Sequence, residues 1–174
     1  MLEFFQKIIA FLNKYNIEYM LTGSVALSVY SLSRATKDFD FIVNIKEENI
    51  DAFIEHFNDG FYCDKNSIKD AIKHKSMFNI IDHASGFKAD FVVLKKEAFR
   101  KTEFKRRQAV DFSGINVFVV SAEDLLISKL MWIQELHSSL QIEDIKAITK
   151  VENLDFNYVH FWIKELNLNT FNIL

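Results

Sequence analysis

The stretch TGSVALSVYSLSRATKDFDFIV (residues 22–43) places two carboxylates at the head of an apolar strand. The run from Phe39 to Val43 is apolar enough for the interior of a sheet, yet Asp38 and Asp40 stand at its start. Side chains two residues apart on a strand point the same way and lie about 7 Å apart along it. Like charges so placed repel, and burying them unpaired is costly. A pair of solvated acids is the commoner explanation of a lone Asp-x-Asp, whereas Mg²⁺ would accept both carboxylates and keep positions for water and phosphates.

The turn before this strand is suited to bind an anion. Residues 17–21 predict a short strand, and residues 24–31 resume in helical spacing after Gly23-Ser24. Glycine lets the backbone approach a ligand closely, and the N-terminus of the following helix offers free N–H groups. Thirteen residues separate Ser24 from Asp38. That is about one helix and a return loop, so the turn and the acid pair can lie on adjacent strands.

The rest of the chain predicts a mixed α/β (α+β) fold, in which a mixed sheet has helices before, between and after its strands. A third acid, Asp90, interrupts another apolar strand. Apolar runs and turn signals predict two hairpins, 77–82 with 88–94 and 108–112 with 115–120. Helical spacing predicts further helices at 2–15, 47–58, 67–75, 121–136, 141–149 and 155–166.

Length and composition indicate a single globular domain over residues 1–174, with its core at about 17–120 and C-terminal helices at about 121–168. Cys63 is the single cysteine, so no intrachain disulfide can form, and a reducing cytoplasm is the expected location. The uncharged run at 19–33 is too short and too rich in Ser and Thr to span a membrane.

Charge argues against a protein whose whole surface grips nucleic acid, because the formal net charge is -3. The segment LKKEAFRKTEFKRR (residues 94–107) is an exception, with seven Lys or Arg against two Glu. Such a run is more often a solvated helix face than a polyanion site.

Several of these pieces together resemble the nucleotidyltransferase fold of the DNA polymerase β superfamily. Within it, the chain is most similar to bacterial nucleotidyltransferases related to abortive-infection and toxin–antitoxin toxins. The resemblance covers most of residues 17–166. The pieces that carry it are Gly23-Ser24, RATKDFD (34–40), FNIID (78–82) before Asp90, and SAEDLL (121–126) before Lys129-Leu130.

The resemblance implies a metal-dependent transfer of a nucleoside monophosphate from a nucleoside triphosphate to an acceptor hydroxyl. Asp38 and Asp40 would bind Mg²⁺ (or Mn²⁺), and Asp90 would join the metal site and help to deprotonate the hydroxyl. That hydroxyl attacks the α-phosphorus and pyrophosphate leaves. The nucleotide- or phosphate-binding residues it implies are Gly23, Ser24, Arg34, Lys129 and Asp144. Relatives usually carry an arginine just before that last acid, where this chain has Gln141-Ile142-Glu143.

The acceptor and the partners stay open at this stage. An RNA end, a protein side-chain hydroxyl, or a small molecule such as an aminoglycoside or lincosamide would each serve. The basic run favours RNA, whereas the acidic net charge and small size favour a small molecule or a protein. A homodimer or a cognate antitoxin is the expected protein partner.

Two other classes of protein share parts of this pattern. A non-catalytic interaction or antitoxin-like module could use the same fold, although the presence of all three acids favours catalysis. Phosphatases of the haloacid dehalogenase type also begin with Asp-x-Asp, but on their first strand and with Thr or Val two residues beyond. Here that residue is Ile42, and the pair falls on the second strand.

Overall fold

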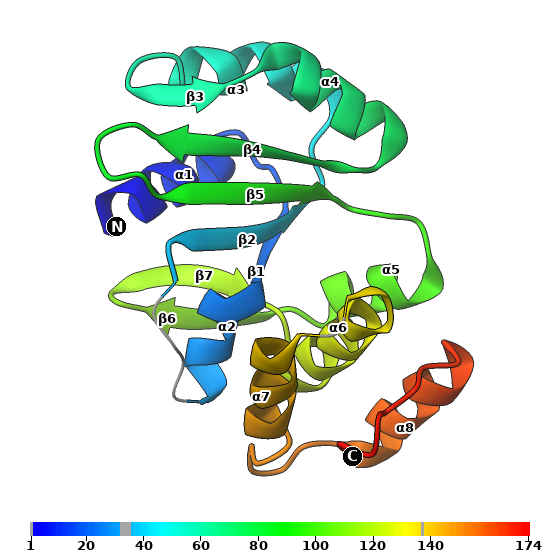
Figure 1. Ribbon diagram of the computed structural model, residues 1–174. Coiled ribbons are helices and arrows are strands. Elements are labelled where there is room, and N and C mark those ends of the chain that lie inside the picture. The colour runs from blue at the N-terminus through cyan, green and yellow to red at the C-terminus, as the bar shows by residue number, and fades with distance from the viewer. Residues whose placement is uncertain (1, 32–35, 137) are drawn as a thin grey trace.

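The computed structural model describes residues 2–31, 36–136 and 138–174. Within these residues, seven strands form one mixed sheet in the order β3-β4-β5-β2-β1-β7-β6 (Figure 1). The strands are β1 (Tyr19–Thr22), β2 (Asp38–Val43), β3 (Phe61–Cys63), β4 (Met77–Asp82), β5 (Lys88–Val93), β6 (Gln108–Phe112) and β7 (Ile115–Val119). The sheet confirms the mixed α/β fold class.

Helices precede, separate and follow the strands, as predicted. They are α1 (Leu2–Lys14), α2 (Gly23–Tyr30), the 3-10 turn η1 (Glu47–Asn49), α3 (Ile50–His56), α4 (Lys65–His74), α5 (Ala98–Lys105), α6 (Ala122–Glu135), α7 (Ser139–Ile148) and α8 (Phe156–Glu165). Within the ranges described, none of them has the length and apolar character needed to cross a bilayer.

Strand β2 lies in the middle of the sheet between two different kinds of neighbour. It pairs antiparallel with β1 and parallel with β5. The two predicted hairpins, β4–β5 and β6–β7, form with antiparallel pairing. As a result, the start of β2 lies beside the end of β1 on one side and beside the start of β5 on the other.

The aromatic core lies on one face of the sheet, and the candidate site residues lie on the other. The Phe5 ring of α1 lies 5.0 Å from that of Phe39 in β2, and the Phe53 ring of α3 lies 5.4 Å from that of Phe91 in β5. Because side chains alternate along a strand, Asp38 and Asp40 project from the opposite face. In Figure 1, α2 and α7 lie in front of the lower part of the sheet on that face, and no helix crosses in front of β4 and β5.

The edge strand β3 was not predicted, and several other elements begin or end one or two residues from their predicted bounds. The edge strand β3 has only three residues and an exposed middle residue, so it carries little of the apolar signal that a sequence pattern uses. The helix predicted at 47–58 begins with the 3-10 turn η1 before α3.

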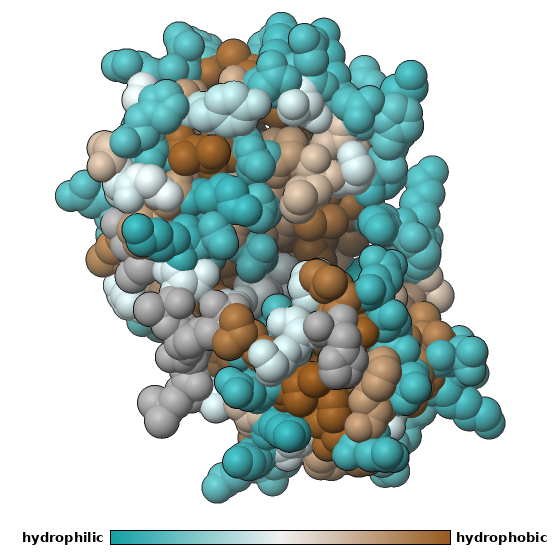
Figure 2. All heavy atoms as spheres, in the orientation of Figure 1, coloured by the Kyte–Doolittle hydropathy of each residue, from teal (hydrophilic) through white to brown (hydrophobic). Residues whose placement is uncertain are grey.

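In Figure 2, hydrophobic atoms gather on the surface in the lower half of the view, around α7, whereas the upper rim over α3 and α4 is mainly hydrophilic.

Candidate functional site

Three acids and one tight turn meet at the junction of β1, β2 and β5. Asp40 pairs in register with Asp90 across the parallel strands, and with Thr22 across the antiparallel pair. Gly23 follows Thr22 directly and opens α2. The order across the sheet is therefore turn, acid pair, third acid, which is the juxtaposition that the spacing of the sequence predicted.

Gly23 packs against the carboxylate of Asp40 so closely that a side chain there has no room. A Cβ built on Gly23 would lie 1.9 Å from Asp40 Oδ2 and 2.6 Å from its Cγ. The φ of Gly23 is +67°, a conformation that residues with a side chain rarely adopt. Ser24 lies buried in the first turn of α2, and the N-cap of that helix is Thr22, so Ser24 is not the capping residue. The first N–H groups of α2 thus begin beside the acid pair.

The carboxyl group of Asp40 is costly to ionise in this setting. Its pKa is raised to about 6 from an ordinary value of 3.8, chiefly by burial and then by the charges of Asp90 and Asp38. The ammonium groups of Lys129 and Lys88 offset part of that effect. The three acids therefore lie near enough to repel one another, and a cation among them would be stabilising.

A lysine that the sequence analysis did not single out lies among the acids. Lys88 pairs in register with Asp38, and its Nζ lies 2.8 Å from Asp90 Oδ2 and 3.9 Å from Asp38 Oδ1. The hydrogen bond that the Lys88 ammonium donates to Asp90 is the main cause that raises the pKa of Lys88. Its position two residues before Asp90, hence on the same face of β5, is the signal that could have revealed it.

The donor set fits a hard divalent cation. Oδ1 of Asp90 is buried and has no hydrogen-bond partner, which is costly for a carboxylate oxygen unless something else binds it. Carboxylate oxygens are the ligands that Mg²⁺ and Mn²⁺ prefer. Among the residues described, no three carboxylate, imidazole or thiolate groups are gathered tightly enough to hold a metal as they stand. Asp38 and Asp90 both contact the Lys88 ammonium.

Lys129 is buried on the same side of the sheet, in α6, and does not reach out to solvent. Its Nζ donates to Asp144 Oδ2 at 2.7 Å and to Gln141 Oε1 at 2.8 Å, both on α7. Lys129 and Asp144 are only 5% and 6% exposed. Gln141 is therefore a neutral acceptor for a buried ammonium that already has one acidic partner.

The remaining cations predicted from sequence lie elsewhere. Arg34 falls outside the described residues. The basic segment at 94–107 does not present seven free charges, because its arginines are bound to acids of the same chain. Arg100 pairs with buried Glu103, Arg106 with Asp124, and Arg107 with Glu18. Four lysines of that segment, Lys95, Lys96, Lys101 and Lys105, are exposed, and so are Glu97 and the paired Arg106.

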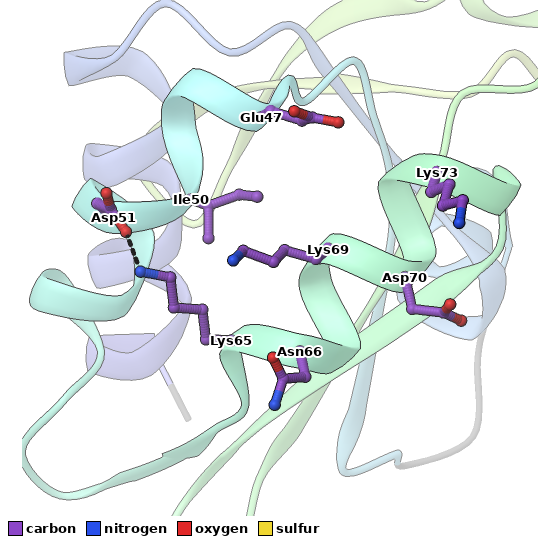
Figure 3. A pocket seen from close by; sticks show the side chains of 8 residues that line it. All are labelled: Glu47, Ile50, Asp51, Lys65, Asn66, Lys69, Asp70 and Lys73. Atoms are coloured by element: carbon purple, nitrogen blue, oxygen red, sulfur yellow. Dashed lines mark hydrogen bonds and ion pairs between the residues drawn. The ribbon is translucent and has the colours of Figure 1, made fainter.

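A separate hollow lies between α3 and α4, and none of the predicted site residues lines it. It is lined by three lysines of α4 (Lys65, Lys69 and Lys73) and by Glu47, Asp51 and Asp70, and Lys65 and Lys69 point from α4 towards α3 (Figure 3). Lys65 is already paired with Asp51. Because the charges of its lining balance, this hollow is less suited to a polyphosphate than the turn at Gly23.

Comparison with known families and structures agrees with this geometry. A family model described as "Nucleotidyltransferase of unknown function (DUF6036)" matches residues 1–173. No curated protein matches the chain by sequence.

Solved structures with the same fold include two antibiotic-modifying enzymes. The crystal structure of ANT(2")-Ia in complex with adenylyl-2"-tobramycin has a TM-score of 0.63 at 12% identity, covering 95% of each chain. The lincosamide antibiotic adenylyltransferase LnuA, bound to lincomycin, has a TM-score of 0.53 at 14% identity, covering 82% of this chain and 92% of that one. An antigenic nucleotidyltransferase-like protein from Paracoccidioides brasiliensis has a TM-score of 0.52 at 18% identity, covering 82% of this chain and 72% of that one.

Proposed function

Since the chain belongs to the DUF6036 family of nucleotidyltransferases, we propose that it transfers a nucleoside monophosphate from a nucleoside triphosphate to an acceptor hydroxyl at the site formed by Asp38, Asp40 and Asp90. The observation that carries the proposal is the placement of Asp40, which lies in register with Asp90 and in contact with Gly23. The turn at Gly23 and the carboxylates therefore lie side by side, which supports the binding of a polyphosphate and its metal at this place.

Asp38, Asp40 and Asp90 would hold the divalent cation, Mg²⁺ or Mn²⁺. When bound, the cation would neutralise charge on the phosphate oxygens and orient them for displacement. The unpartnered Oδ1 of Asp90 and the mutual repulsion of the three carboxylates support this assignment.

Gly23, Ser24 and the first turn of α2 would bind the terminal phosphates. Backbone N–H groups at a helix N-terminus favour an anion, and a residue without a side chain lets the phosphates approach. Lys129 lies close enough to lower the pKa of Asp40 and would add positive charge at the same place. Asp144 and Gln141 would act through Lys129, because they fix its ammonium.

Asp90 would accept the proton of the attacking hydroxyl. The hydroxyl oxygen then forms a bond to the α-phosphorus while the bond between that phosphorus and the bridging oxygen breaks, so pyrophosphate leaves with the bridging oxygen. In-line attack requires the acceptor to approach from the side opposite the leaving group. If pyrophosphate lies at Gly23, the acceptor approaches over β5 and β4, on the face of the sheet from which the acids project.

The acceptor would therefore lie on the part of the sheet that no helix covers in Figure 1. Asn79 of β4 is in register with Asp90 and projects from the same face, and Met77 on that face is 54% exposed. Two structural relatives are an adenylyltransferase bound to lincomycin and an enzyme holding adenylyl-2"-tobramycin. This favours a small hydroxyl-bearing molecule. The basic segment supports RNA as the acceptor less than its composition suggested, because its arginines are paired with acids of the same chain. A protein hydroxyl is a further alternative.

A non-catalytic role on the same fold is the second candidate. It is favoured by one observation: the acids among the described residues do not form a ready three-ligand set, and the Lys88 ammonium contacts two of them. A homodimer or a cognate antitoxin as partner stays a prediction.

Label transfer tests the proposal. The protein is incubated with Mg²⁺ or Mn²⁺, each α-labelled nucleoside triphosphate in turn, and separate pools of small hydroxyl compounds, total RNA and protein. Label should enter one pool with the wild-type chain and with Asp59→Asn, an exposed acid with no role in the site, but not with Asp40→Asn. Transfer that persists in Asp40→Asn would exclude the site. The absence of transfer, together with no thermal shift on adding metal and any triphosphate, would favour the non-catalytic role.

A further inference from the structure

Lys88 places a positive charge where the proposed metal site needs one. Its ammonium lies 2.8 Å from Asp90 Oδ2 and 3.9 Å from Asp38 Oδ1, so it contacts an acid on each of the two parallel strands. The register that pairs Asp38 with Lys88 and Asp40 with Asp90 makes this placement a property of the sheet. The ammonium is thus held on the face from which all three acids project.

The Lys88 ammonium can move away from the carboxylates as well as bind them. Its side chain is 34% exposed, whereas that of Asp90 is 12% exposed. A lysine is a compact charge on a flexible four-carbon stem, so it can withdraw towards water without moving the backbone. Lys129 differs in this respect, because it is 5% exposed and its ammonium is held by Asp144 and Gln141.

We propose that Lys88 is an internal counter-ion that occupies the metal position in the nucleotide-free protein and competes with the divalent cation for Asp38 and Asp90. This rests on the proposed function, since it assumes that these acids hold the metal. An ammonium of charge +1 neutralises the acids only in part, and a divalent cation must displace it to reach the same oxygens. Metal therefore binds weakly to the protein alone. It binds more tightly together with a triphosphate, whose own oxygens add ligands and negative charge.

The consequence is a coupling between metal and nucleotide. Each ligand strengthens the binding of the other by the same factor, and part of that factor is the displacement of Lys88. Removing the ammonium should raise the affinity of the empty protein for metal and reduce the coupling. A lysine that served only to stabilise the sheet would have no such effect.

Titration of Mn²⁺ into nucleotide-free protein, followed by electron paramagnetic resonance at low ionic strength, tests the proposal without an activity assay. Lys88→Met keeps the stem and removes the charge. We expect it to bind Mn²⁺ about tenfold more tightly than the wild type, the scale of one partly buried ion pair. Lys37→Met removes an exposed charge next to Asp38 and should change the affinity less than about twofold. Lys88→Gln is the second variant if the methionine variant does not fold.

The outcomes separate this inference from the proposed function. Wild-type binding of Mn²⁺ that is lost in Asp40→Asn, with Lys88→Met no tighter than wild type, would overturn the counter-ion role and leave the metal site standing. An equal gain in Lys37→Met would also overturn it, because the effect would then be general electrostatics. Mn²⁺ binding that Asp40→Asn leaves unchanged, or no binding by any variant, would overturn both.

Discussion

In the absence of metal, the ionised side chain of Asp40 is expected to destabilise the folded protein. Its pKa in the folded protein is raised to about 6 from an ordinary value of 3.8, chiefly by burial and then by Asp90 and Asp38. A shift of about 2 units is worth about 3 kcal/mol at 1.36 kcal/mol per unit. Asp40→Asn has nearly the same shape as the protonated acid and carries no charge. Without metal at pH 7.5, it should therefore be more stable than the wild type by up to about 3 kcal/mol, or roughly 6 to 12 °C in Tm for a chain of this size.

The pH dependence gives the sharper test. A raised pKa means that folding favours the protonated form, so this contribution to stability is fully present below pH 3.8 and is lost as the pH rises through about 6. The advantage of Asp40→Asn should thus be largest above pH 7 and shrink as the pH falls from 7 to 4.5, measured by urea unfolding in the presence of a chelator. Asp38→Asn is the matched control, because the Asp38 side chain is 51% exposed and should gain much less. A variant less stable than the wild type at pH 7.5, or an advantage that does not change with pH, would refute this electrostatic account.

Two further substitutions test the packing around the site. Gly23→Ala should abolish the thermal shift produced by metal and triphosphate and should lower stability by more than Gly114→Ala. Both residues have positive φ, but only at Gly23 does the new Cβ meet Asp40, whereas at Gly114 the space is open and only backbone strain of about 1 to 2 kcal/mol is added. Equal losses in the two variants would contradict the contact. Lys129→Met should cost about 3 to 5 kcal/mol in urea unfolding, because it leaves Asp144 buried and unpaired. Removing both charges, in Lys129→Met with Asp144→Leu, should recover much of that loss, and a double variant as unstable as the single one would show that the pair matters for packing.

The sequence was informative wherever one local rule decided the structure. Alternation along residues 38–43 forces Asp38 and Asp40 to one face, and an apolar run around Asp90 makes it a strand residue too. The spacing between Gly23-Ser24 and the acid pair allows one helix and a return, which predicts adjacent strands. Each of these expectations needed only neighbouring residues, and the structure places the groups together.

The contacts that depend on strand register or on helix packing could not be predicted from the sequence. The position of Lys88 two residues before Asp90 indicates the face from which it projects, but its contact with Asp38 depends on the register in which β5 pairs with β2. The ion pair of Lys129 with Asp144 links two helices whose relative rotation no periodicity specifies. The sequence pattern indicated that the arginines of the basic segment were exposed charges. Their acidic partners lie 3 to 89 residues away in the chain, so the ion pairs become apparent only in the folded structure.

The cost of the acid pair is itself an argument about function. A strand that needed only stability would place apolar or neutral residues where Asp40 and Asp90 lie, since burying an apolar group there costs less than burying like charges. The surrounding residues reduce that cost only in part. Lys88 and Lys129 lower the pKa of Asp40, yet it remains near 6, and Oδ1 of Asp90 remains without a partner. Residual instability of this kind is relieved when a multivalent cation binds, and a site whose own residues removed it entirely would leave little free energy for that binding.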